Sequence, residues 1–116
     1  MTVKELMEQM DLKLLTPQAD LSAQVSVGYT CDLLSWVMSH GAQGMAWITV
    51  QTHMNVVAVA SLLEMSCVII PEGIQVPDDV AAKADEEGVA LLSSECTAYE
   101  LCGRMRELGV AHSKRQ

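Results

Sequence analysis

Two residues of this sequence could act as a nucleophile or a base, Cys31 and His53, and each follows a predicted strand. A thiol near a helix N-terminus can lose its proton more readily, and an imidazole titrates close to neutral pH. Asp32 could orient such a pair, but no spacing fixes an acid, a base and an orienting group together. An inert small side chain at Cys31 and a surface or capping role for His53 explain the same residues. We therefore assign no catalytic residue and keep a small enzyme using Cys31 or His53 as the alternative.

Polar residues gather in four short segments, and each segment is predicted to connect a strand to the next helix. The segments are residues 28–32, 51–55, 71–73 and 93–97. Ligands of parallel α/β sheets bind outside the carboxyl ends of the strands, where such segments meet. We expect a ligand site there, and its candidate residues are Gly28, Tyr29, Thr30, Asp32, Gln51, Thr52, His53, Asn55, Gly73, Ser93, Ser94 and Thr97.

Helix capping is the alternative explanation for several of these residues. Thr30 or Asp32 could cap one helix, and Thr52 or Asn55 the next, because their side chains accept hydrogen bonds from free backbone N–H groups. Ser94 and Thr97 could offer hydroxyls and free N–H groups to an anion at the start of the last helix. Ordinary capping at this helix start remains equally compatible with the sequence.

No motif indicates a metal, a cofactor or phosphoryl transfer. The four cysteines, Cys31, Cys67, Cys96 and Cys102, match no CxxC spacing of a zinc or redox site. We therefore expect four reduced, metal-free thiols and no cofactor. The sequence also lacks the GxxxxGK[ST] pattern of the common nucleoside triphosphate cradle.

The overall charge argues against nucleic acid as a partner. Fifteen acidic residues outnumber seven basic ones, which gives a formal net charge of −8, and only Lys114-Arg115 resembles a basic patch. Phosphate backbones are bound by clustered Lys and Arg. Half of the residues are apolar, but no apolar run approaches the ~20 residues of a membrane span. With no basic and apolar leader at the N-terminus, we expect a cytoplasmic protein that does not enter membranes.

Hydrophobic periodicity and turn residues predict how these segments are positioned. They indicate strands that alternate with helices, which favours one α/β domain with a small, mainly parallel sheet flanked by helices. We expect the domain over residues 1–110 and a polar tail over 111–116. The expected helices are 2–10, 32–40, 56–63, 77–87 and 97–108, and the expected strands are 12–16, 25–27, 45–50, 67–70 and 89–92.

The apolar pattern also predicts where each strand lies. Residues 45–50 and 67–70 are apolar almost throughout, which is typical of central strands covered on both faces. Residues 12–16 lack a clear helical connection to the next strand and are expected at an edge or antiparallel. The helix over 56–63 is apolar nearly all round, so we expect it to be packed on more than one side.

Three segments resemble stand-alone DRTGG-domain proteins. They are GYTCDLLS at 28–35, QTHMNVVAVA at 51–60 and VIIPEG at 68–73. The likeness covers about residues 3–109. The family is related to the N-terminal domain of bacterial HPr kinase/phosphorylase and also occurs joined to phosphotransacetylase and CBS domains, and none of these associations makes the domain a catalyst. Pro71-Glu72-Gly73 stands where many relatives carry Thr-Gly-Gly, so only Gly73 of that tripeptide is shared.

The resemblance implies an HPr kinase N-terminal-domain-like α/β fold, frequent dimerisation and a sensory or regulatory role in a bacterium or archaeon. Similar small proteins accompany iron-only hydrogenase or other redox genes. We therefore expect a non-catalytic module that binds a small ligand, such as a nucleotide or another anion, a partner enzyme, or both. A purely structural subunit is the remaining alternative.

A homodimer is also expected from the composition itself. A domain this small has limited interior volume in which to bury so many apolar residues. The helix over 56–63 and the side of the preceding helix that carries Trp36 and Met38 are the expected contact surfaces. The alternative is that both helices are packed entirely within one chain.

Overall fold

The structure is a computed structural model that describes residues 1–113. Residues 114–116 of the predicted tail lie outside the described part. The helices are α1 (Val3–Met10), α2 (Leu34–His40), α3 (Met54–Leu62), α4 (Asp78–Glu86) and α5 (Ala98–Glu107). The strands are β1 (Lys13–Leu14), β2 (Val27–Thr30), β3 (Met45–Ile48), β4 (Cys67–Ile70), β5 (Leu91–Ser93) and β6 (Ala111–His112).

The six strands form one sheet in the order β1-β5-β4-β3-β2-β6. All neighbouring pairs are parallel except β1 and β5, which are antiparallel. Every residue of β3 and β4 is buried, because helices cover both faces of these two strands. The structure therefore confirms the predicted α/β fold, the central place of the two apolar strands and the edge place of the first strand.

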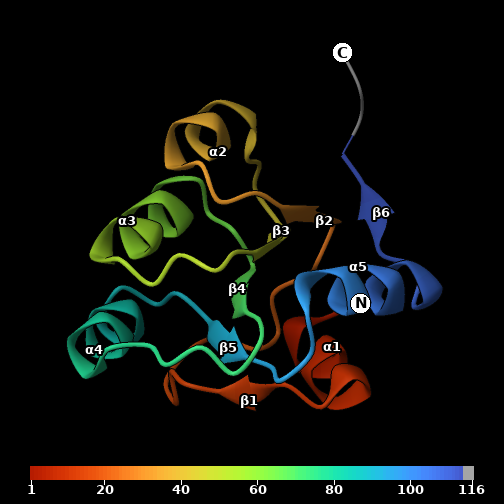
Figure 1. The fold of residues 1–116 in the computed structure, drawn as a ribbon, viewed down its shortest axis with the longest axis horizontal. Coiled ribbons are helices and arrows are strands. Elements are labelled where there is room, and N and C mark those ends of the chain that lie inside the picture. The colour runs from red at the N-terminus through yellow and green to blue at the C-terminus, as the bar shows by residue number, and fades with distance from the viewer. Residues whose placement is uncertain (114–116) are drawn as a thin grey trace.

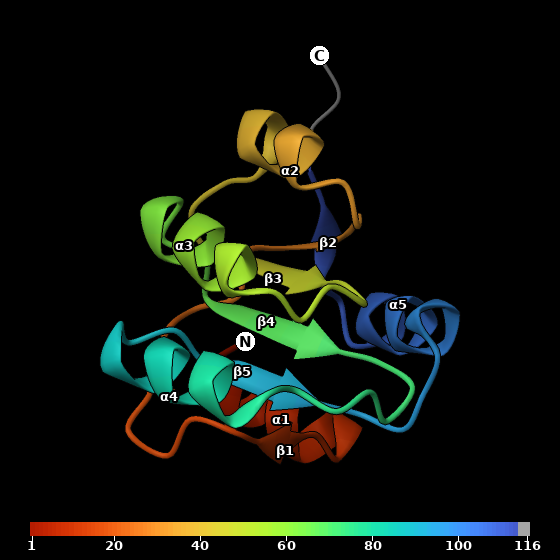
Figure 2. The ribbon, with the colours of Figure 1, turned by 60° about the vertical axis from the view of Figure 1, so that its left-hand side comes forward.

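Helices cover the sheet in two unequal layers. Figures 1 and 2 show α2, α3 and α4 on one face and α1 and α5 on the other. Alternate residues of β3 supply the two cores: Met45 and Trp47 pack beneath the first layer, and Ala46 and Ile48 beneath the second. α3 packs against both α2 and α4. This position explains why its sequence is apolar nearly all round, as predicted.

Local sequence signals explain how the first and last helices begin. Thr2 caps α1 by accepting from the N–H of Glu5 at 3.1 Å, while the Glu5 carboxylate accepts from the N–H of Thr2 at 3.0 Å. Thr97 and Glu100 repeat this reciprocal arrangement at the start of α5. The capping box satisfies two backbone donors that the helix leaves free.

Two predicted boundaries at the β2 side of the sheet are wrong. β2 continues to Thr30, so residues 28–30 belong to a strand and not to the turn before the next helix. The predicted polar tail also begins too early, because Ala111 and His112 form β6 and pair with Val27 and Gly28. Hydrogen bonding between these segments, which are distant in sequence, decides both boundaries, and local periodicity does not report it.

Two predicted helix caps are also wrong. α2 begins after Leu33 without a side-chain cap, because the Thr30 hydroxyl donates to the carbonyl of Ile48 and the Asp32 carboxylate bonds to the next loop. α3 begins at Met54, and its cap is His53, whose Nδ1 accepts from the N–H of Asn55 at 3.1 Å. An imidazole nitrogen can replace the usual oxygen acceptor at such a position.

None of the helices within residues 1–113 has the length and hydropathy that a membrane span requires. Over the same residues, no three His, Cys, Asp or Glu side chains come together as a metal site would require.

Candidate functional site

A pocket of about 260 Å³ lies between β2, β6 and α5. We call it the β2–β6 pocket. Residues 28–30 of β2 and Ile48 of β3 form one wall, and the last turns of α5 form another. The remaining lining residues are Cys102, Met105, Arg106, Val110, Ala111, His112 and Ser113. Three of the predicted ligand residues, Gly28, Tyr29 and Thr30, therefore meet here with residues from the C-terminal end of the chain.

Gly28 sets the depth of the pocket. A Cβ at this position would lie 2.7 Å from Cε of Met105 and 3.4 Å from Cγ1 of Val110. The missing side chain lets α5 and the following turn approach β2 closely. The chain then turns at Gly109, which has a φ of +88°, and the N–H of Val110 donates to the carbonyl of Met105 at 2.9 Å. This turn directs Ala111 and His112 back along β2.

The polar groups of the pocket suit an anion. Arg106 is exposed on the last turn of α5, and its Nη1 donates to the carbonyl of Val110 at 3.5 Å. His112 of β6 also lines the pocket, with Nδ1 2.9 Å from the carbonyl of Ser113. A guanidinium presents five donors, so one weak bond to the backbone leaves others for a ligand. Burial raises the pKa of the Cys102 thiol, which keeps this side of the pocket uncharged.

The sequence concentrates positive charge at the same end of the chain. Arg104, Arg106, Lys114 and Arg115 lie within the last thirteen residues and are four of the seven Lys and Arg residues. Of these four residues, Arg106 lines the pocket. A cation beside a pocket attracts anions even when the net charge of the protein is negative.

A second group of predicted residues forms a polar connection between two loops. The Asp32 carboxylate accepts from the Thr49 hydroxyl at 2.8 Å and from the N–H of Val50 at 2.9 Å. Nε2 of Gln51 donates to the carbonyl of Asp32 at 3.3 Å. Thr52 follows half-buried in the same loop. The structure brings these residues together at the carboxyl ends of β2 and β3, where their hydrogen bonds hold the loops in place.

The two candidates for catalysis, Cys31 and His53, have separate surroundings. Sγ of Cys31 lies 3.9 Å from the carbonyl of Leu33, and the carbonyl of Cys31 accepts from Nε1 of Trp47 at 2.9 Å. Nδ1 of His53 is engaged in capping α3. Within residues 1–113, no hydrogen bond joins Cys31 to His53. Neither residue lines the β2–β6 pocket.

Tyr29 connects the pocket strand with the α2 side of the sheet. Burial, and then the neighbouring Cys31, raise the pKa of its phenol. The tyrosine therefore remains neutral at physiological pH and contributes a hydroxyl rather than a charge.

At the carboxyl ends of β4 and β5, the chain satisfies its own hydrogen-bonding groups. The N–H of Glu72 donates to the carbonyl of Cys96, and the N–H of Gly73 donates to the carbonyl of Ser94, both at 2.8 Å. The Ser94 hydroxyl accepts from the N–H of Cys96 at 3.0 Å. We call residues 71–73, together with 94–96, the β4–β5 turn. The N–H groups of Glu72, Gly73, Ser94 and Cys96 are therefore occupied and are not available to an anion.

Acidic side chains surround this turn. A Cβ on Gly73 would lie 2.5 Å from Oε2 of Glu95, so that carboxylate lies directly against the turn. At the start of α5, the Glu100 carboxylate accepts from the N–H and the hydroxyl of Thr97. Gly73 and Ser93 line a separate cavity of about 330 Å³, together with Lys13, Asp78 and Glu95. Such a rim repels anions more than it attracts them.

The backbone at Glu72 is unusual for a residue with a side chain. Its φ is +60°, and that of Gly73 is +62°. The left-handed region is adopted most easily by glycine. The DRTGG resemblance places a glycine of the relatives at Glu72, and the backbone conformation here is the one that such a glycine would adopt.

Sequence reasoning did not identify Arg106, His112, Met105 and Val110 as pocket residues. Two features of the sequence could have indicated them. Basic residues cluster near the C-terminus, which favours an anion site, and the apolar pair Val110-Ala111 follows a glycine, which is compatible with a short strand. The short strand and its parallel pairing with β2 could not be read from two residues.

Comparison with solved structures identifies a similar fold. The structure is similar to the CBS and DRTGG domains of the regulatory region of Clostridium perfringens pyrophosphatase, which was crystallised with its activator, diadenosine tetraphosphate. The TM-score is 0.67, the sequence identity is 8%, and the match covers 90% of this chain. This chain spans 45% of that structure's length. At this identity the likeness concerns the fold alone. No family model and no curated protein matches the sequence.

Proposed function

We propose that this chain is a non-catalytic regulatory module that binds a small anion, with a nucleotide as the first candidate, in the β2–β6 pocket. One observation carries the proposal: the pocket places apolar walls from Ile48, Met105 and Val110 beside Arg106 and His112. Small-molecule sites are mostly apolar, with a few polar groups that fix the orientation of the ligand.

The size of the pocket indicates how a nucleotide would fit. About 260 Å³ is slightly below the usual range for sites that enclose a whole ligand. The base would occupy the apolar part, and the phosphates would remain outside near Arg106 and His112. Binding of diadenosine tetraphosphate by the structurally similar regulatory region supports the choice of nucleotides as the first ligands to test.

The surroundings of Cys31 and His53 support a non-catalytic role. Neither side chain lines the β2–β6 pocket, and His53 has a structural role as a helix cap. A general base must reach the proton that it removes, directly or through one water molecule. An enzyme using Cys31 or His53 would therefore need a different site from the one proposed, and a purely structural subunit would need no ligand at all.

Further parts of the proposal rest on the sequence and the DRTGG resemblance. We propose a single DRTGG-like domain that extends past residue 110 to include β6, acts as a cytoplasmic homodimer and regulates a partner enzyme in a bacterium or archaeon. The glycine-like backbone of Glu72 supports the resemblance. The link to redox or hydrogenase metabolism stays a prediction.

Calorimetric titration of the purified chain with AMP, ATP, diadenosine tetraphosphate and inorganic phosphate tests the proposal. We expect at least one nucleotide to bind, and Arg106→Gln to weaken that binding about tenfold or more, because a charge-assisted bond is lost. Arg104→Gln is the matched control. Arg104 lies on the same helix but outside the pocket, with Nη1 3.8 Å from Sγ of Cys96.

Cys31→Ser should leave nucleotide binding unchanged. The proposal fails if none of the probes binds, or if the Arg106 and Arg104 variants lose affinity equally. Binding that is lost in Cys31→Ser and retained in Arg106→Gln would favour the alternative site.

A further inference from the structure

We infer that the surface over α2 and α3 is the interface through which two copies of this chain pair. This inference rests on the homodimer proposed above and identifies its contact face. A groove of about 320 Å³ separates the two helices. Leu34 and Met38 of α2 line one side, and Ala58, Val59 and Leu62 of α3 line the other. We call this surface the α2–α3 face.

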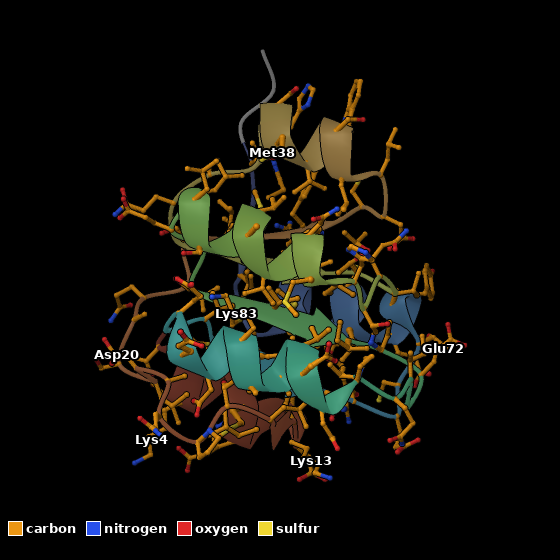
Figure 3. The ribbon with its side chains drawn as sticks, turned by 90° about the vertical axis from the view of Figure 1, so that its left-hand side faces the viewer. Lys4, Lys13, Asp20, Met38, Glu72 and Lys83 are labelled. Carbon is orange, nitrogen blue, oxygen red and sulfur yellow. The ribbon has the colours of Figure 1, made fainter. Side chains whose placement is uncertain are left out.

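Large apolar side chains on this face are exposed to solvent. Leu62 is 67% exposed and Met38 is 42% exposed, although both border the groove. Figure 3 shows Met38 on α2, the outermost helix of the layer that faces the viewer. Ala58 is exposed one turn before Leu62, and its small side chain leaves room for a side chain from another molecule. An apolar patch with both a projection and a groove is typical of a contact surface.

The distribution of charge identifies a second copy as the occupant. None of the fifteen acidic and seven basic residues lies between Asp32 and Glu64, the segment that contains all of α2 and α3. Each copy carries a formal net charge of −8, so most of its surface repels an identical molecule. The α2–α3 face lets two copies approach without bringing like charges together. A face that recognises a differently charged partner would instead present complementary charges.

Charged residues begin where the α2–α3 face ends. On α4, the next helix of the layer, Nζ of Lys83 lies 3.0 Å from Oε1 of Glu87. Both residues line the neighbouring groove between α3 and α4, and Figure 3 shows Lys83 on that side of α3. An uncharged centre with a charged rim is the usual composition of a protein interface.

Two-fold symmetry fits this surface. In a closed dimer the same patch contacts itself, so a projection and a groove must lie on one face. Leu62 of one copy would enter the groove beside Ala58 of the other.

Light scattering of the wild-type chain and of Leu62→Glu and Tyr99→Glu tests the inference. Tyr99 is the matched control, because it is 90% exposed on α5 and outside the α2–α3 face. We expect the wild type and Tyr99→Glu at twice 12.6 kDa, and Leu62→Glu at 12.6 kDa with an unchanged circular dichroism spectrum. If Leu62→Glu does not fold, Met38→Lys on the other side of the groove decides the matter by the same measurement.

The outcomes separate the two proposals. A wild-type mass of 12.6 kDa overturns both the homodimer and its interface. A folded Leu62→Glu variant that remains at twice that mass overturns the interface and leaves the homodimer standing. Loss of the dimer in Tyr99→Glu as well would also overturn the assignment to the α2–α3 face.

Discussion

The β2–β6 pocket and the β4–β5 turn both adjoin strands of one sheet, yet their surroundings differ. Near β2, the β2–β6 pocket is open, has apolar walls and carries Arg106 and His112. At β4, the β4–β5 turn uses the N–H groups of Glu72 and Gly73 for its own hydrogen bonds, and Glu95 lies against it. Position at the ligand edge of a sheet therefore does not by itself make a residue available to a ligand. Free donors and favourable charge are also needed, and the β2–β6 pocket, which lies along β2 rather than beyond its carboxyl end, combines them.

The largest expected difference concerns two thiols, Cys67 of β4 in the core and Cys102 beside the β2–β6 pocket. Burial raises the pKa of Cys67, which lies in β4, from 9.0 to about 12. Cys102 is half-buried and lines the β2–β6 pocket. The thiolate is the reactive form. Burial also raises the pKa of Cys102, but this thiol is only partly buried. At pH 8 in the native protein, we therefore expect iodoacetamide to modify Cys102 at least about tenfold faster than Cys67. Peptide mass spectrometry over time measures both rates.

Ligand protection adds a control to the same experiment. A saturating nucleotide should slow modification of Cys102 and leave Cys96 unaffected, because Cys96 lies on the β4–β5 turn and does not line the pocket. After unfolding in urea, all four thiols should react at similar rates. Rapid modification of Cys67 in the native state would contradict its burial in the core.

The next largest effect is the loss of stability when alanine replaces Gly73 in the β4–β5 turn or Gly28 in the β2–β6 pocket. Gly73→Ala should destabilise the protein by about 1 to 2 kcal/mol, because its φ is +62° and a Cβ is strained there. The new Cβ would also lie 2.5 Å from the Glu95 carboxylate, the end of an exposed side chain that can move aside at a smaller cost. Gly28→Ala places a Cβ 2.7 Å from Cε of Met105, the end of a flexible side chain that can move aside. Its cost should stay below about 1 kcal/mol. Urea unfolding measures both variants.

For nucleotide affinity we expect the opposite ranking, with the larger effect in Gly28→Ala. Gly28→Ala narrows the β2–β6 pocket and should weaken nucleotide binding, whereas Gly73→Ala should not change it. Adding Glu95→Ala to Gly73→Ala should restore the part of the lost stability that comes from contact between the new Cβ and the Glu95 carboxylate. A larger loss of stability in Gly28→Ala than in Gly73→Ala would reverse the comparison.

The sequence predicted those parts of the fold that depend on local patterns. The apolar runs at 45–50 and 67–70 identified the central strands, and Thr2 identified the start of α1. The β2–β6 pocket could not be predicted in the same way. It depends on β6, a strand of two residues that pairs with Val27 and Gly28, and two residues carry no periodic pattern. The sequence grouped all the predicted site residues at the strand ends. The structure instead divides most of them among the β2–β6 pocket, the connection between the loops after β2 and β3, and the β4–β5 turn.

The predicted role of residues 93–97 shows the same limit. A serine or threonine before a helix indicates either a cap or an anion site, and sequence alone left both open. The structure shows Thr97 and Glu100 in a capping box, so a carboxylate of the chain itself already accepts from the N–H of Thr97. The Glu at the third helical position was the signal that favoured capping.

The smallest expected effect concerns the backbone of Glu72, which Figure 3 shows at the edge towards which the β4 arrow points. Its φ of +60° is strained for a residue with a Cβ. Glu72→Gly should therefore stabilise the protein by about 0.5 to 1 kcal/mol, measured by urea unfolding, even though glycine gains entropy in the unfolded chain. The hydrogen bond from this N–H to the carbonyl of Cys96 is retained. Glu72→Gln is the matched control, since it removes the charge and keeps the strain, and its stability should change by no more than a few tenths of a kcal/mol. Equal stabilisation by both variants would show that charge repulsion, and not backbone strain, distinguishes the β4 end.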